Sequence, residues 1–477
     1  MKRYIPDIVL TSLFIIFSFW ILAVKNGFML RWYDEMSLFE PGFDSLRQFL
    51  LYPGGIFRFA GTYLTQLLYY PALGSCVLIF IWLLLAWLTK IAFRLRGVST
   101  PLCFLVPFCM LASILHLDEA YLNFESQGYV FYNSLGFTFS LAVLALFSMA
   151  RYNSIAQKTI AILLPLLYPV AGFFALMPAI LCDITLCISA IKNKKLYNIA
   201  GAVLSILLIV VVPLLYYRYC NGTTVDNDYL YLKGLPELTM EDYDWYLWQP
   251  FAIASIFLLT LSLLSSFADH LQFTSSKIIK YSSWGLFLLG LIFSLSADGK
   301  KSEQLRATVL MINAIENHDW RKATHIMSLT KESPNYTMCV LDNLARTYSG
   351  MERKSTGNMQ TVNKDFRHNE DFTINTFVDV PVNHYIGRFN QSHRWATENN
   401  VLYGNRAYYI KYIVRNALLN GDLEFAKKYN QLLMRTMFHR QWAQEINRYI
   451  ENPELINTLP DFGFLMALRA EEIMRGE

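Results

Sequence analysis

The stretch IVLTSLFIIFSFWILAV, residues 8–24, contains no charged side chain. A helix needs about 20 apolar residues to cross a membrane, and this stretch approaches that length. Lys2 and Arg3 precede it, as in a secretory signal peptide, but no small-x-small cleavage site follows. The sequence therefore predicts a first membrane span that is retained in the mature protein.

Apolar runs of similar length continue along the chain as far as residue 297. The whole sequence is 54% hydrophobic and only 16% charged, whereas a soluble protein is about a quarter charged. The predicted spans are 8–25, 74–93, 101–117, 130–149, 159–173, 174–191, 198–216, 250–267 and 283–297. We predict an all-α protein: a polytopic membrane domain of about nine spans at 1–297 and a soluble helical-repeat domain at 298–477. The residues Tyr168–Gly172 form either a tight turn or the break of a re-entrant pair.

Charged residues alternate between the predicted loops. Basic residues gather in every second loop: Lys2 and Arg3; Lys90, Arg94 and Arg96; Arg151 and Lys158; Lys192, Lys194 and Lys195; Lys277 and Lys280. Such loops face the cytoplasm in membrane proteins. We therefore expect a protein of the cytoplasmic (inner) membrane with a cytoplasmic N-terminus and, after nine spans, a periplasmic C-terminal domain. Nucleotide-sugars are absent on that outer side, so a sugar donor there would arrive on a lipid.

The first outer loop, about 26–73, is long for a connection. FDSLRQFLLY (43–52) and IFRFAGTYLTQLLYY (56–70) both have helical apolar spacing, and Pro53-Gly54-Gly55 separates them. Two interfacial helices at about 43–70 fit this pattern. The alternative is that 56–73 joins the next span as one tilted helix.

Paired acids follow two of the spans on the outer side. RWYDEMSLFEP (31–41) contains Asp34 and Glu35, and LHLDEAYLNFE (115–125) contains Asp118 and Glu119. An acidic pair after the first span, followed by two surface helices, resembles the GT-C superfamily of polyprenyl-phosphate-dependent glycosyltransferases. The resemblance covers about residues 1–130 and implies that Asp34 or Glu35 is a catalytic base or metal ligand, joined by Asp118 and Glu119.

Transfer from a lipid phosphate needs a base for the acceptor hydroxyl, and carboxylates can serve. Arg31, Arg58 and Arg218 could bind the departing phosphate, because the guanidinium group contacts phosphate oxygens in pairs. A divalent metal ion remains an alternative, since paired acids offer some of the oxygen ligands it needs. The acids could also be ordinary solvated residues beside a span, and Glu40 is expected to be one.

Other polar residues have structural explanations at this stage. His116 is expected to be a hydrogen-bonded structural residue, and His384 and His393 to lie in a surface loop. Asp183 lies within an apolar run, where an acid is costly and therefore a functional candidate.

The C-terminal part contains an internal repeat. Residues 313–323 read NAIENHDWRKA and residues 416–426 read NALLNGDLEFA. Both fit N-A-[IL]-x-N-x-D-[WL]-x-x-A, a pattern typical of tetratricopeptide-like helical hairpins, which often bind partners. The polar segment 352–400 is expected to be a long irregular insertion. The chain is also similar to multi-span envelope proteins with a helical periplasmic tail.

Two functions remain open. The first is a GT-C-type glycosyltransferase that uses membrane lipid, as a polyprenyl-linked sugar, on the extracytoplasmic side. The second is a non-enzymatic envelope scaffold whose tail binds a protein partner. The net charge of +4 is small and dispersed, so nucleic acid is not an expected partner.

Overall fold

The protein is all-helical, as predicted. The computed structural model describes residues 5–95, 97–117, 127–193, 197–221, 227–235, 245–267, 277–299, 303–352, 371–458, 463 and 465–467. Across these residues the regular structure is helical, apart from one bridge between Lys233 and Leu235.

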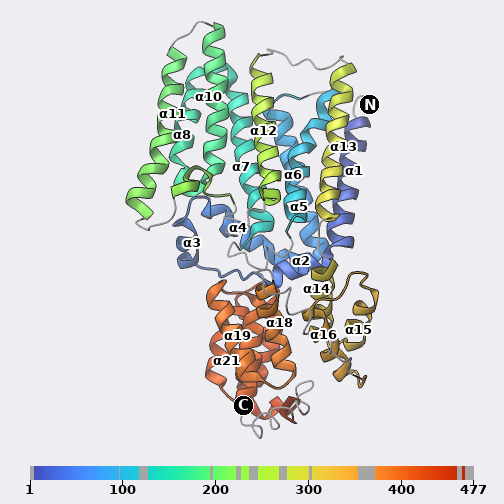
Figure 1. The fold of residues 1–477 in the computed structure, drawn as a ribbon. Helices are drawn as coiled ribbons and strands as arrows, with labels where there is room; N and C mark the ends of the chain where they lie inside the picture. Colours follow the sequence, from blue (N-terminus) through green and yellow to red (C-terminus); the bar gives the residue numbers. More distant parts are fainter. Residues whose placement is uncertain are drawn as a thin grey trace.

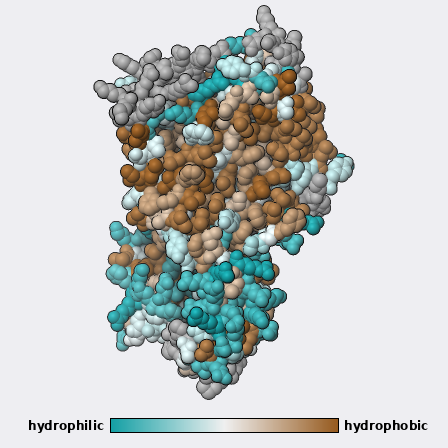
Figure 2. Space-filling model, turned by 180° about the vertical axis from the view of Figure 1, so that it is seen from behind, coloured by the Kyte–Doolittle hydropathy of each residue, from teal (hydrophilic) through white to brown (hydrophobic). Residues whose placement is uncertain are grey.

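An elongated bundle of helices forms the N-terminal part (Figure 1). Its helices are α1 (Ile5–Phe19, continued to Lys25 by a π-helical segment), α2 (Gly27–Glu35), α3 (Phe43–Leu50), α4 (Gly55–Thr65), α5 (Pro71–Ala92), α6 (Leu105–Leu115), α7 (Tyr129–Met149), α8 (Ser154–Leu166), α9 (Tyr168–Ala171), α10 (Phe173–Asn193), α11 (Tyr197–Tyr216), α12 (Trp245–Phe267) and α13 (Lys277–Gly299). Figure 2 shows a broad apolar surface over this bundle and a hydrophilic surface over the tail below it.

The number of full-length spans is smaller than predicted. Six described helices are long and apolar enough to cross a membrane: Asp7–Lys25, Pro71–Ala92, Tyr129–Tyr152, Phe173–Lys192, Gly201–Tyr219 and Leu247–Ser266. A seventh is added if the pair Tyr281–Asp298 and Glu303–Glu316, bent by 66°, counts as one span. The predicted nine is therefore too high. Two of the remaining segments, Thr100–Leu115 and Ser154–Leu166, are helical but shorter, since a 3-10 segment precedes α6 and α8 ends before Pro169.

The N-terminus and the C-terminal tail lie at opposite ends of the bundle (Figure 1). Basic side chains gather at the N-terminal end: Lys90 pairs with Asp7 at 2.9 Å, and Arg94 donates to the Ser148 carbonyl at 2.7 Å. The first outer loop, with α2, α3 and α4, lies at the tail end. Which end of the bundle faces the cytoplasm stays a prediction.

The first outer loop contains separate short helices. Tyr70 is extended, at φ −109° and ψ 98°, and Pro71 begins α5. The alternative of one tilted helix through residue 73 is therefore wrong. Gly54, with φ +83°, separates α3 from α4, and a Cβ there would lie 2.7 Å from the Cα of Gly234. Only glycine allows this backbone contact, which fixes the loop against a distant segment.

The tail consists of helical hairpins. Its helices are α14 (Glu303–Glu316), α15 (Trp320–Leu329), α16 (Tyr336–Tyr348), α18 (Asp371–Tyr385), α19 (Phe389–Leu402), α20 (Ala407–Asn420), α21 (Leu423–Met434) and α22 (His439–Glu451). The expected irregular insertion at 352–400 is wrong over its described part, because α18 and α19 occupy 371–402. Residues 353–370 lie outside the described residues.

The two copies of the repeated motif form equivalent turns. Asp319 caps α15 by accepting from the Lys322 amide, and Asp422 caps α21 by accepting from the Phe425 amide. The residue before each aspartate is left-handed: His318 has φ +56° and Gly421 has φ +81°. The repeated alanines, Ala323 and Ala426, are both fully buried. The repeat therefore encodes a helix–turn–helix unit in which a small residue packs at the centre.

Apolar packing is continuous between the bundle and the tail. One cluster of buried side chains extends from Phe14 of α1 to Tyr412 of α20, and the Trp32 ring lies 5.2 Å from the Tyr408 ring. The proposed boundary at residue 297/298 stays a prediction.

Candidate functional site

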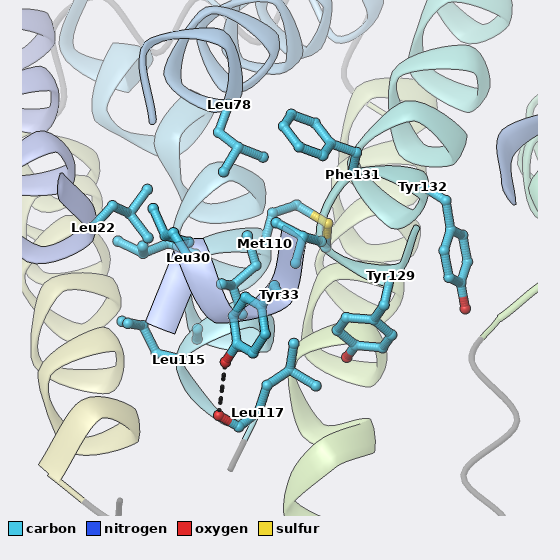
Figure 3. Packing of buried hydrophobic residues seen from close by; sticks show 14 of the residues in the cluster. Leu22, Leu30, Tyr33, Leu78, Met110, Leu115, Leu117, Tyr129, Phe131 and Tyr132 are labelled. Atoms are coloured by element: carbon cyan, nitrogen blue, oxygen red, sulfur yellow. Dashed lines mark hydrogen bonds between the residues drawn. The ribbon is translucent and has the colours of Figure 1, made fainter. Parts of the chain in front are cut away.

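Helix α2 places the first acidic pair where the bundle meets the tail. Leu30 and Tyr33 pack against Leu22 and Leu115, and the Tyr33 hydroxyl donates to the Leu117 carbonyl at 3.1 Å (Figure 3). These contacts fix the rotation of α2. Asp34 and Glu35 are only 2% and 8% exposed, so neither is a solvated surface acid.

Glu35 forms a buried ion pair with the tail. The Lys411 ammonium group, from α20, donates to both carboxylate oxygens at 2.7 and 2.6 Å. The Arg31 guanidinium lies 3.4 Å from the same carboxylate. Burial alone would raise the pKa of Glu35, but Lys411, with His439 and Arg31 nearby, lowers it to about 2. Glu35 is therefore ionised and engaged at neutral pH.

Arg31 is engaged as well. Its guanidinium donates to the Tyr69 carbonyl at 2.8 Å and lies 3.3 Å from the centroid of the Tyr69 ring. These contacts leave Arg31 less available for a phosphate than the sequence alone suggested.

Asp34 faces a histidine that the sequence did not indicate. Its Oδ2 lies 3.1 Å from Nε2 of His439, the first residue of α22, and both side chains are nearly fully buried. Burial raises the pKa of Asp34, and the contact with His439 only partly offsets this effect. Asp34 and His439 thus form a buried acid–imidazole pair, and the raised pKa of Asp34 makes this carboxylate easier to protonate than that of Glu35.

The loop before α22 holds His439 in place. The Met437 amide donates to Gln66 Oε1 at 2.8 Å, and the Phe438 ring stacks on Tyr69 with centroids 5.3 Å apart. The site is therefore built half from the first outer loop and half from the tail.

Three possible metal ligands meet here, because ligand atoms of Asp34, Glu35 and His439 lie within 4.8 Å of one another. However, Lys411 already bonds both oxygens of Glu35, and Arg31 adds a second positive charge. When all four groups are ionised, the two negative charges of Asp34 and Glu35 cancel the two positive charges of Arg31 and Lys411. A divalent cation would therefore meet two positive charges and no excess of negative charge, which disfavours its binding. The donor set fits an acid–base pair better than a resident metal ion.

The other predicted residues are more scattered. Arg58 of α4 is half-buried with its guanidinium 5.8 Å from the Tyr132 ring centroid, and no salt bridge involves it among the described residues. Arg218 is exposed in the π-helical segment Tyr217–Asn221 that follows α11, with its guanidinium 5.7 Å from the Tyr219 ring centroid, and no hydrogen bond or ion pair links it to α2 among the described residues. Asp118 and Glu119 lie outside the described residues. Glu40 was expected to be solvated, but it accepts a hydrogen bond from Asn405 of the tail.

Other candidates do not join the site. Asp183 is buried in α10 beside a cavity between α10, α11 and α12. His384 was expected on the surface but is buried in α18, where its Nδ1 lies 2.7 Å from Asn416 Oδ1. Burial lowers the pKa of His384 to about 3, which keeps it neutral and structural.

No local pattern in the sequence indicates His439, and only a weak one indicates Lys411. Lys411 is the single charge inside AYYIKYIV (407–414), whose aromatic and aliphatic neighbours are mostly buried. A lone charge on the apolar face of a helix usually has a buried partner, and that pattern could have indicated one.

The protein combines an apolar helical bundle with a helical tail that covers a buried carboxylate–imidazole pair. These features define a multi-helix protein of the membrane type. The chain matches the family of unknown function DUF6057 over residues 3–474 and belongs to that family. No curated protein and no solved structure matches it.

Proposed function

We propose that this protein is an integral protein of the cytoplasmic (inner) membrane that transfers a sugar from a polyprenyl-phosphate-linked donor to an acceptor on the periplasmic side. The observation that carries the proposal is the contact of 3.1 Å between Asp34 and His439, buried where the first outer loop meets the tail. The resemblance of this loop to GT-C enzymes supplies the reaction class.

The proposed topology has a cytoplasmic N-terminus and a periplasmic tail. Its support is the gathering of Lys90 and Arg94 at the bundle end opposite the tail, since basic loops face the cytoplasm. Phosphatase fusions after residue 299 should be active and fluorescent-protein fusions near residue 194 should be bright; the reverse pattern would place the site in the cytoplasm.

In the proposed reaction Asp34 is the general base. It accepts the proton of the acceptor hydroxyl as that oxygen forms a bond to the anomeric carbon of the sugar. The bond from that carbon to the phosphate oxygen breaks, and the polyprenyl phosphate leaves with the electron pair. Burial raises the pKa of Asp34, which makes its carboxylate a stronger base, and the proposed role of His439, whose Nε2 lies 3.1 Å from the carboxylate, is to orient it.

Glu35 and the arginines take different roles. Glu35 anchors the tail through Lys411 and does not act as a base, since its pKa is lowered to about 2. Arg58 is the phosphate-binding candidate best supported, because its guanidinium is not engaged in an ion pair among the described residues. A divalent ion is not required for this scheme.

The test uses the purified protein in nanodiscs with a panel of polyprenyl-phosphate-linked radiolabelled hexoses and pentoses and a periplasmic extract as acceptor source. Wild type should move label out of the organic phase. Asp34→Asn should slow this transfer by about 10²–10⁴-fold, the usual cost of losing a positioned base. Asp44→Asn, an exposed acid of α3, is the matched control and should be silent. A wild type that consumes no donor, or a fully active Asp34→Asn, would refute the proposal.

A scaffold function is the second candidate. It is favoured by the ion pair between Glu35 and Lys411, which fastens the tail to the bundle and needs no chemistry. In that case Asp34→Asn changes no glycan, whereas variants that release the tail lose a protein partner.

A further inference from the structure

Several large apolar side chains are exposed at helix ends and in one loop of the tail. Val401 is 79% exposed, Leu402 61% and Leu329 63%, and Tyr336 and Met437 are also exposed. We call these five residues the tail rim. Apolar groups of this size are stabilised when they leave water for an apolar surrounding.

Val401 and Leu402 lie close to the start of one candidate membrane span. They end α19, and the Gln127 side chain donates to the Asn405 carbonyl just after them at 2.9 Å. Gln127 lies two residues before Tyr129, where the candidate span Tyr129–Tyr152 starts.

Met437 lies at a similar level on another part of the tail. Its amide donates to Gln66 at 2.8 Å, and the next residue, Phe438, stacks on Tyr69. Tyr69 lies two residues before Pro71, the first residue of the candidate span Pro71–Ala92.

Leu329 and Tyr336 lie near the end of a third candidate span, the first one along the chain. Between them, the Lys331 amide donates to Glu303 at 3.1 Å, and Gln304 donates to the Ser333 carbonyl at 2.9 Å. Arg306, in the same first turn of α14, donates to the carbonyl of Lys25, the last residue of the first span.

We propose that the tail rim enters the headgroup region of the outer leaflet, so that the tail is seated on lipid as well as on the bundle. The three points come from different elements, with α15 and α16 on one side of the tail and α19 on the other (Figure 1), yet all lie near span ends. A flat bilayer surface would contact the exposed side chains at all three points at once, whereas a compact protein partner would cover only one side of the tail. Interfacial segments reach about 5–10 Å into this region.

The exposed side chains of the first outer loop extend the same surface. Phe43, at the start of α3, is exposed, and so are Leu51 and Tyr52 just beyond its end. The inference rests on the proposed membrane position of the bundle and not on glycosyl transfer.

The test places the photoreactive residue p-benzoylphenylalanine at one position at a time in the full chain. The protein is reconstituted in nanodiscs of phosphatidylcholine and phosphatidylglycerol whose acyl chains carry an alkyne, and lipid adducts are counted after illumination. Ile256, exposed on α12, is the positive control, and Leu455, exposed beyond the far end of α22, is the matched apolar control.

The proposal predicts adduct yields at positions 401 and 329 several-fold above that at position 455 and similar to that at position 256. Yields at 401 and 329 equal to that at 455, with strong labelling at 256, would overturn the proposal while leaving the membrane position intact. No labelling at 256 would refute the membrane position itself, and the seated tail with it.

Discussion

Lys411→Met tests the ion pair that joins the tail to the first outer loop. The change leaves Glu35 buried with only Arg31, at 3.4 Å, as a close cation. The lowering of the pKa of Glu35 from 4.5 to about 2 corresponds to roughly 3 kcal/mol in favour of the charged form. Breaking a buried pair on one side costs about 3–5 kcal/mol. We therefore expect the tail to lose about 3 kcal/mol of docking free energy.

Hydrogen exchange of the protein in nanodiscs measures this loss. A change of about 3 kcal/mol should speed the exchange of peptides from α20 and α22 roughly 100-fold. Lys427→Met, an exposed lysine of α21, is the matched control and should leave exchange unchanged. The double variant Glu35→Gln with Lys411→Met removes both charges and should recover most of the loss. Equal exchange in Lys411→Met and Lys427→Met would refute the reasoning.

Three further outcomes are expected. Gly421→Ala should destabilise the tail by about 1 kcal/mol, because the backbone of residue 421 is in the left-handed region. His318→Gly, at the equivalent turn, should stabilise the tail by about the same amount for the same reason. Thermal unfolding of the two variants tests both expectations. Ala426→Leu should cost about 1–3 kcal/mol in the same assay, since this fully buried position has no room for a larger side chain. The docking contribution of the Glu35–Lys411 ion pair, measured as the difference in exchange between wild type and Lys411→Met, should be constant above pH 4.5 and disappear as the pH falls towards 2, because the pKa of Glu35 is lowered in the folded protein. A contribution that persisted at pH 2 would contradict the assigned ion pair.

Local patterns in the sequence predicted the helices well. Apolar runs located the helices of the bundle, and the Asn-x-Asp repeat located two turns whose capping aspartates, Asp319 and Asp422, form the expected bonds. The number of spans was too high because apolar character alone does not measure helix length. A 3-10 segment before α6 and the proline-containing turn after α8 shorten two helices, and such breaks depend on backbone geometry.

The site was only half predictable. Asp34 and Glu35 stood out because two adjacent acids follow a span, but their partners come from about 376 residues further along the chain, as for Lys411 and Glu35. Nothing local distinguishes His439 from an ordinary surface histidine, since its role depends on the tail folding back onto the first loop. The sequence predicts an irregular insertion at 352–400, because its polar side chains resemble those of a surface loop in the sequence alone, yet 371–402 is helical and buries some of them, such as His384.

The most direct test of the account compares the two neighbouring acids in one transfer assay. Asp34→Asn removes the proposed base, whereas the double variant Glu35→Gln with Lys411→Met removes the anchoring pair without a change in net charge. The account predicts that, in nanodiscs with polyprenyl-phosphate-linked sugars, Asp34→Asn loses about 10²–10⁴-fold in transfer rate while its tail stays docked by hydrogen exchange, and the double variant keeps most of its activity. An active Asp34→Asn beside an inactive, docked double variant would contradict it.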